Sequence, residues 1–158
     1  MEETEQRGRA SGRAAVTRLE HVAIVVDDPA AAVAFFAELG LDLEGEATLK
    51  GNTVDRLSGL DGVRSDIAMM RTPDGHGRLE LIKYHTPPGP GGDPGAPPNT
   101  PGIRHIVFAV EGIEDVVDRL RSHGAELVGE LVRYENSYWL CYVRGPDGII
   151  VELAEKIG

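Results

Sequence analysis

Two histidines and two glutamates recur at matching places in two similar stretches of the chain. His21 and His105 each lie within a short segment, and the two segments are near copies of each other. Further along, each copy ends in an apolar stretch that contains one glutamate, Glu80 in the first and Glu152 in the second. Mixed imidazole and carboxylate ligands suit Zn, Ni, Co, Mn or Fe better than Mg or Ca. The repeat therefore predicts a site for one divalent metal ion, with His21, Glu80, His105 and Glu152 as its ligands.

The residues around these four predict the same order of elements in both copies. Each copy begins with a β-branched stretch typical of a strand, continues into a helix that a glycine ends, and closes with three further strands. The offset that maps His21 onto His105 also maps Gly40 onto Gly124. We expect strands over 19–26, 41–48, 66–71 and 78–84 with a helix over 27–39, and then strands over 103–110, 126–132, 137–144 and 149–154 with a helix over 113–122.

These elements predict an α+β fold of two tandem βαβββ modules. The first module spans 18–85 and the second spans 103–158. Between them, residues 86–102 hold seven of the ten prolines and are expected to form a linker. Residues 1–17 are polar, without the apolar run of a secretory signal, and are expected to form a disordered tail.

Alternation of side chains along each strand predicts that all four candidate ligands lie on the sheet faces that the helices do not cover. Val22 and Ile24 are expected to pack on the helix of their module, so His21 faces the other way. The same count leaves His105, Glu80 and Glu152 on the faces that the helices do not cover. If each sheet curls, these faces line one cleft. Taken singly, a strand histidine is more often a hydrogen-bonded core residue, and it is the duplication that favours a metal site.

The hairpins suggest further residues for a substrate pocket. Met69 and Arg71 are expected on the face of Glu80. If Pro146-Asp147-Gly148 lies in a four-residue turn, Cys141 is opposite Glu152 and Trp139 shares its face. Ordinary core packing is an equally good explanation for Met69 and Cys141.

Composition limits the classes of partner. The formal net charge of −10 argues against nucleic acid and against anionic membranes, because both require a basic surface. No apolar run approaches the length of a membrane span. Cys141 is the only cysteine, which excludes an intrachain disulfide and fits a reducing, cytoplasmic location.

The repeated segments resemble the vicinal oxygen chelate superfamily, which includes glyoxalase I, methylmalonyl-CoA epimerase, extradiol dioxygenases and fosfomycin-resistance enzymes. The resemblance spans Arg18 to Glu155 and is carried by the segments Glu20–Ile24, Arg78–Ile82, Arg104–Phe108 and Gly145–Leu153. It implies paired βαβββ modules that form a cleft around a divalent metal. It also implies a small-molecule substrate and a homodimer, because many relatives form the site between two chains.

The resemblance implies four protein ligands, which leave two positions open on an octahedral metal ion. Among the family members, this number of ligands is closest to that of glyoxalase I and the epimerase. The implied reaction is proton transfer beside a metal-chelated carbonyl, by a lyase or isomerase. Glu152 or Glu80 would act as the catalytic base, with Glu152 slightly favoured. The alternatives are an acyl-CoA epimerase, an Fe(II) dioxygenase of the extradiol type, and a non-catalytic binding or resistance protein.

Overall fold

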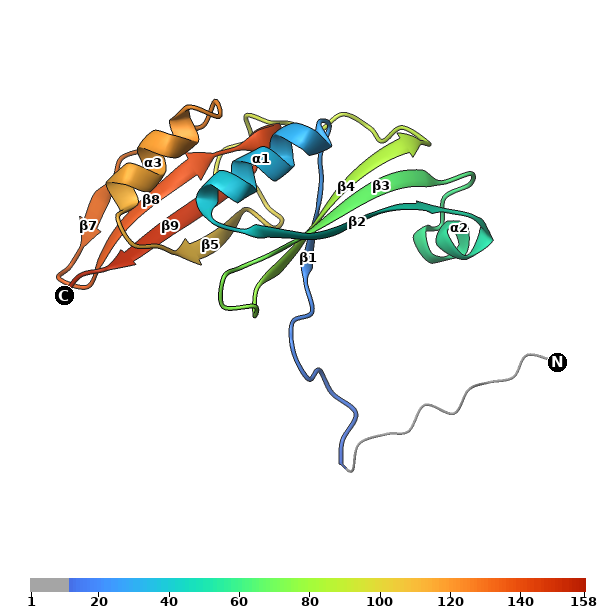
Figure 1. Cartoon of the computed structure of the whole chain (residues 1–158), viewed down its shortest axis with the longest axis horizontal. Helices are drawn as coiled ribbons and strands as arrows, with labels where there is room; N and C mark the ends of the chain where they lie inside the picture. The colour runs from blue at the N-terminus through green and yellow to red at the C-terminus, as the bar shows by residue number, and fades with distance from the viewer. Residues whose placement is uncertain (1–11) are drawn as a thin grey trace.

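The structure, a computed structural model, describes residues 12–158, and the first module forms a four-stranded sheet with one helix packed on it (Figure 1). The sheet order is β1-β4-β3-β2, in which β1 runs parallel to β4 and the other pairs are antiparallel. Its elements are β1 (Val22–Val25), α1 (Pro29–Leu39), β2 (Asp42–Lys50), α2 (Asn52–Ser58), β3 (Arg64–Arg71) and β4 (Arg78–Thr86).

The second module repeats this topology. Its sheet has the order β5-β9-β8-β6, and a further strand, β7, pairs with β8. As in the first module, the first and last strands run parallel. The elements are β5 (His105–Ala109), α3 (Ile113–Arg121), β6 (Glu126–Leu127), β7 (Val132–Tyr134), β8 (Tyr138–Arg144) and β9 (Ile150–Lys156), with a 3₁₀ turn at Pro146–Gly148. The α+β class and the duplicated βαβββ order are confirmed.

Helices α1 and α3 lie on the same side of the molecule and contact each other, so the two modules share one core (Figure 1). Phe35 and Phe36 of α1 are fully buried, as is Leu120 of α3. Two ion pairs from Glu38 of α1 extend this contact, to Arg119 at 3.1 Å and to His123 at 3.5 Å. The modules are therefore joined through their helices, and the outer faces of both sheets are left uncovered.

Two predicted segments differ from the structure. The loop expected over 50–62 contains a short helix, α2, none of whose residues is buried. Asp55 fixes the return of the chain by accepting hydrogen bonds from the backbone N–H groups of Gly62 and Val63. The single strand expected over 126–132 is wrong, because β6 and β7 are separate short strands that pair with different parts of β8.

The predicted linker contains no helix or strand beyond Thr86, the last residue of β4, but it is tied to the second module. Arg144 donates hydrogen bonds to the carbonyl oxygens of Pro94, Ala96 and Gly148. Ala96 is buried. The sequence does not predict this contact, because a high proline and glycine content indicates only that a segment lacks helices and strands. Of the expected tail, residues 1–11 lie outside the described residues, and 12–17 form neither helix nor strand and are exposed. Within residues 12–158, no helix has the length and apolarity needed to span a membrane.

The contact between linker and second module predicts a difference between two glycine substitutions. Gly148 and Gly75 occupy equivalent hairpin turns at nearly the same positive φ, 77° and 78°. A Cβ on Gly148 would lie 2.0 Å from the Pro94 carbonyl oxygen, whereas a Cβ on Gly75 meets nothing within 4 Å. Gly75→Ala should cost about 1–2 kcal/mol from backbone strain alone. Gly148→Ala should cost about 1–3 kcal/mol more, because backbone must move. Urea unfolding of both variants measures this difference, and equal losses would contradict the packing.

Candidate functional site

His21 and Glu80 are in direct contact on the uncovered face of the first sheet. The Nε2 atom of His21 lies 2.9 Å from Oε2 of Glu80, and the side chains are 33% and 16% exposed. The register explains the contact. Ala23 of β1 is opposite Glu80 of β4, and His21 is two residues before Ala23 on the same face. Both residues therefore lie on the face that the helix does not cover, as predicted, and the structure adds their direct contact.

His105 and Glu152 have the same register relation in the second sheet, without an ion pair between their side chains among the described residues. Val107 of β5 is opposite Glu152 of β9, so His105 again stands two residues before the partner of the glutamate. The ring of His105 lies beside that of Tyr142, with centroids 5.0 Å apart and planes inclined by 30°. Tyr142 is also the cross-strand partner of Glu152. The two modules thus present the same imidazole and carboxylate groups at equivalent positions.

Within one chain, the two pairs do not meet. No group of three or more His, Cys, Asp or Glu side chains among residues 12–158 is arranged to hold a metal ion. A groove of about 190 Å³ lies where β1 and β5 approach each other, and His105 is in its lining. The sequence left open whether the site forms within one chain or between two. Each chain carries one imidazole and one carboxylate on the open face of each sheet, and each such His–Glu combination is called a half-site.

Apolar side chains beside both half-sites are exposed. Val25, on the face of His21, is 61% exposed, and Val107, on the face of His105, is 49% exposed. Each half-site fits a divalent metal in its donor chemistry, because an imidazole nitrogen and a carboxylate oxygen are ligands for borderline transition ions. The first half-site also shows the His and Glu donors already brought together at 2.9 Å.

A cluster of charged groups surrounds the first half-site. Arg78, two residues before Glu80, contacts Glu20 at 2.5 Å and Glu44 at 2.9 Å. The hydrogen bond to Glu44, with the negative charges of Glu44 and Glu20, raises the pKa of Arg78 above its usual value. Glu20 immediately precedes His21 in the chain. Sequence reasoning missed Glu20, Arg78 and Glu44, although an acidic residue next to the predicted ligand was a visible signal.

The expected pocket residues of the first module lie where the sequence placed them. Met69 is directly opposite Glu80, and Arg71 follows two residues later on the same face. Arg71 is exposed, and Met69 is partly exposed. They remain candidates for substrate contact.

The corresponding expectation for the second module is wrong. The turn runs from Gly145 to Ile149, so Arg144 is opposite Ile150 and Cys141 is opposite Leu153, not Glu152. A register change of one residue moves every side chain to the other face. Cys141 is buried in the core, and burial raises the pKa of its thiol to about 11, so the thiolate nucleophile is scarce near neutral pH. The residue beside Glu152 is Tyr142, which sequence reasoning missed because of the same error.

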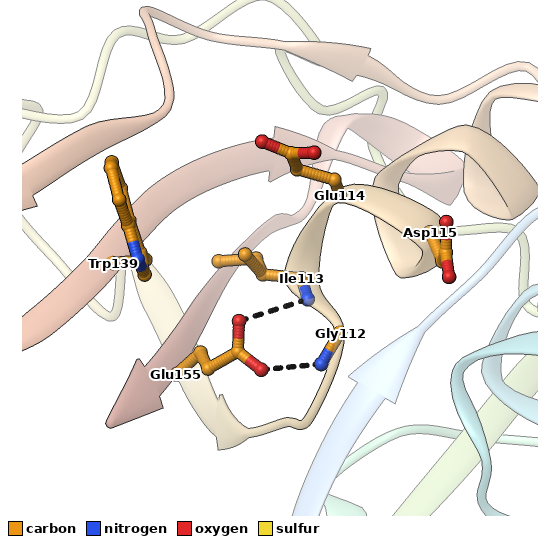
Figure 2. Close-up of a pocket in the computed structure, with 6 residues that line it drawn as sticks. All are labelled: Gly112, Ile113, Glu114, Asp115, Trp139 and Glu155. Atoms are coloured by element: carbon orange, nitrogen blue, oxygen red, sulfur yellow. Dashed lines mark hydrogen bonds between the residues drawn. The ribbon is translucent and has the colours of Figure 1, made fainter. Parts of the chain in front are cut away.

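Because of the same change of register, Trp139 lies on the helix-covered face of the sheet and not on the predicted face of Glu152. It lines a surface pocket of about 320 Å³ at the beginning of α3, together with Glu155 (Figure 2). Figure 2 shows the Glu155 carboxylate pointing at the backbone of Gly112 and Ile113, whose N–H groups donate to it. The anion-binding capacity of this helix end is therefore already used by the protein itself.

Comparison with known proteins agrees with this architecture. A glyoxalase family protein from Bacillus cereus is similar over 94% of this chain and 100% of its own, with 48% sequence identity and a TM-score of 0.89. The Escherichia coli K12 protein YaeR is 26% identical over 140 residues, which cover 88% of this chain and 96% of that protein.

A more distant likeness shows the fold alone. The fosfomycin resistance protein FosX from Listeria monocytogenes, solved with Mn(II) and 1S,2S-dihydroxypropylphosphonic acid, has a TM-score of 0.57 at 13% identity, covering 88% of this chain and 90% of its own. The profile of the Glyoxalase/Bleomycin resistance protein/Dioxygenase superfamily matches residues 18–153. With two modules of the same topology, each carrying a His–Glu pair on its open face, the chain belongs to this superfamily.

Proposed function

We propose that the protein is a metal-dependent lyase or isomerase of the glyoxalase I kind. It would act on a small oxygenated substrate by moving a proton next to a carbonyl. The observation that carries the proposal is the repetition of one His–Glu arrangement on the exposed face of both sheets, His21 with Glu80 and His105 with Glu152. The same two metal-ligating residue types are present at equivalent positions of both halves, and in each half they lie on the face away from the helix, which supports a shared chemical role.

A complete ligand set requires two copies of the chain in this proposal. His21 and Glu80 of one copy would share a divalent ion with His105 and Glu152 of a second copy. The separation of the two pairs within one chain supports this assembly, as does the exposure of Val25 and Val107 beside them. A symmetric dimer formed through these faces would bury the valines and complete two equivalent sites.

The protein side chains have distinct parts in the proposed reaction. When bound, a divalent ion (Ni, Co, Zn, Mn or Fe) supplies Lewis-acid stabilisation of the negative charge that develops on the substrate oxygen. The four ligands leave room for two neighbouring substrate oxygens. A carboxylate of the set, preferentially Glu152, removes the proton from carbon and returns it nearby. Met69 and Arg71, on the face of Glu80, would contact the rest of the substrate.

The likeness to FosX supports the choice of ligand class. That protein was solved with Mn(II) and a dihydroxy phosphonate, which is a small oxygen-rich molecule. The two proteins share the fold, and the substrate of this chain is a separate question.

Metal analysis of the purified protein, followed by substrate profiling, tests the proposal. We expect one divalent ion per His–Glu–His–Glu set, loss of activity with a chelator, and recovery with Ni, Co, Mn or Zn. Profiling on α-keto hemithioacetals and acyl-CoA esters separates the glyoxalase reaction from the epimerase reaction. Oxygen uptake with a catechol would instead indicate a dioxygenase. A protein that binds no metal in any of these assays would be a non-catalytic binder, and the proposal would be wrong.

A further inference from the structure

The two ring nitrogens of His21 have unequal surroundings. Nε2 lies 2.9 Å from Oε2 of Glu80. Nδ1 is buried and has no hydrogen-bond partner among the described residues. The Glu20 carboxylate lies close to it, with Oε1 at 4.0 Å. A buried ring nitrogen without a partner is unusual and calls for an explanation.

The position of the proton on the ring decides which kind of partner Nδ1 needs. A neutral imidazole carries its proton on one nitrogen and a lone pair on the other. If Nε2 donates to Glu80, then Nδ1 carries only a lone pair, and no donor faces it. A nitrogen that binds a metal must offer its lone pair, so coordination through Nε2 requires the proton to be on Nδ1. That buried N–H would then need an acceptor, and the Glu20 carboxylate is beside it.

Glu20 is held in this place by cations on both sides. Arg78 contacts its Oε1 and Arg18 contacts its Oε2, each at 2.5 Å. Arg78 is itself fixed by Glu44 through two nitrogens, at 2.9 Å and 3.0 Å. The carboxylate is therefore held close to the imidazole, and a short movement would complete a hydrogen bond.

The second module has no equivalent arrangement. Arg104 precedes His105 where Glu20 precedes His21, and Ile150 stands in the place of Arg78. His105 is exposed and is positioned by the ring of Tyr142. The acidic group is thus a particular feature of the first half-site and not a consequence of the repeat.

We propose that Glu20 is a positioning residue, which accepts a hydrogen bond from Nδ1–H of His21 and so fixes Nε2 as the nitrogen offered to the metal. The inference rests on the proposed metal-dependent function. A carboxylate behind a ligand histidine selects its tautomer, orients its ring and increases its basicity. Glu20 would act through His21 and would not touch the substrate. Arg78 would set the position of Glu20.

The test compares zinc binding by the full chain and by two matched variants. Glu20→Gln removes the charge with little change in size. Glu46→Gln makes the same change on β2 of the same sheet, at an exposed residue with no ion pair among the described residues. Competition with a chromogenic chelator should show an affinity lower by about 10–100-fold for Glu20→Gln and an unchanged affinity for Glu46→Gln. Circular dichroism and the thermal midpoint establish that both variants are folded.

Nitrogen-15 NMR of the His21 ring gives a readout that a merely structural role would not move. In the unmodified protein, zinc should convert His21 to the Nδ1-protonated tautomer, with slow exchange of that proton. In Glu20→Gln the exchange should become faster. Equal zinc affinities, or zinc-loaded protein with Nδ1 unprotonated, would overturn the role of Glu20 and leave the metal function intact. If the unmodified protein bound none of zinc, nickel, cobalt and manganese, the proposed function itself would be overturned instead.

Discussion

Mixing a His21→Ala variant with a His105→Ala variant should restore activity that neither variant has alone. In the proposed dimer, each site takes His21 from one chain and His105 from the other. A dimer of either variant with itself lacks one histidine in both sites. In the mixed dimer, one site lacks both histidines and the other has all four ligands. The mixed dimer should therefore bind one metal ion and have about half of the wild-type activity.

Two differently tagged chains, co-expressed and purified through both tags, isolate the mixed dimer for this measurement. The matched control combines His21→Ala with Glu80→Ala on the other chain. Both changes affect the same half-site, so each site of that dimer lacks one ligand and neither is complete. Recovery in the first combination and not in the second would show that the site is shared. If neither combination recovers activity, the assembly is different from the one proposed.

The duplicated fold could be predicted because it depends on local patterns. The alternation of apolar residues in the strands and the glycines that end the helices can be recognised in the sequence itself, and both halves predict the same order of elements. The common face of His21 and Glu80 followed from the same alternation, since a residue's face depends only on its count along the strand. Met69 likewise lies on the face of Glu80, as predicted, and the structure adds that it is directly opposite Glu80.

The second hairpin shows where such counting fails. One additional residue in the turn between Gly145 and Ile149 changed the partner of Glu152 from Cys141 to Tyr142. The turn contains two residues at positive φ, Asp147 and Gly148, and Gly148 packs closely against Pro94 in the linker, which lies far away in the sequence. A prediction from local pattern cannot include a contact between such distant residues, and its error reverses the face of a whole strand.

The separation of the two His–Glu pairs depended on tertiary structure in the same way. Side-chain alternation predicts which face a histidine occupies but not which face of the other module it meets. That choice is made by the buried contact of α1 with α3, to which Phe36 and Leu120 contribute. Once the helices join the modules, the open faces are free for another chain.

The two glutamates should differ in effect when each is changed to glutamine. Glu80 is 2.9 Å from the His21 imidazole, whereas Glu152 forms no ion pair among residues 12–158. In the structure Glu80 already lies beside a ligand imidazole, where it could coordinate a metal ion with little movement, whereas Glu152 is not fixed in this way and would be better able to leave the metal and take a proton. Glu152→Gln should therefore lower kcat by about 10²–10⁴-fold at saturating metal. Glu80→Gln should act mainly on metal affinity, with a smaller loss of kcat once the metal is supplied in excess.

Measuring kcat across a range of metal concentrations separates the two effects, because a loss of affinity is recovered at high metal and a lost base is not. Thermal unfolding of both variants controls for damage to the sheet. The opposite pattern, with a lasting loss of kcat only in Glu80→Gln, would assign the base to Glu80. If Glu80→Gln changed neither property, Glu80 would not be a ligand. The three-ligand set of two histidines and one glutamate, typical of the extradiol dioxygenases, would then describe the site better.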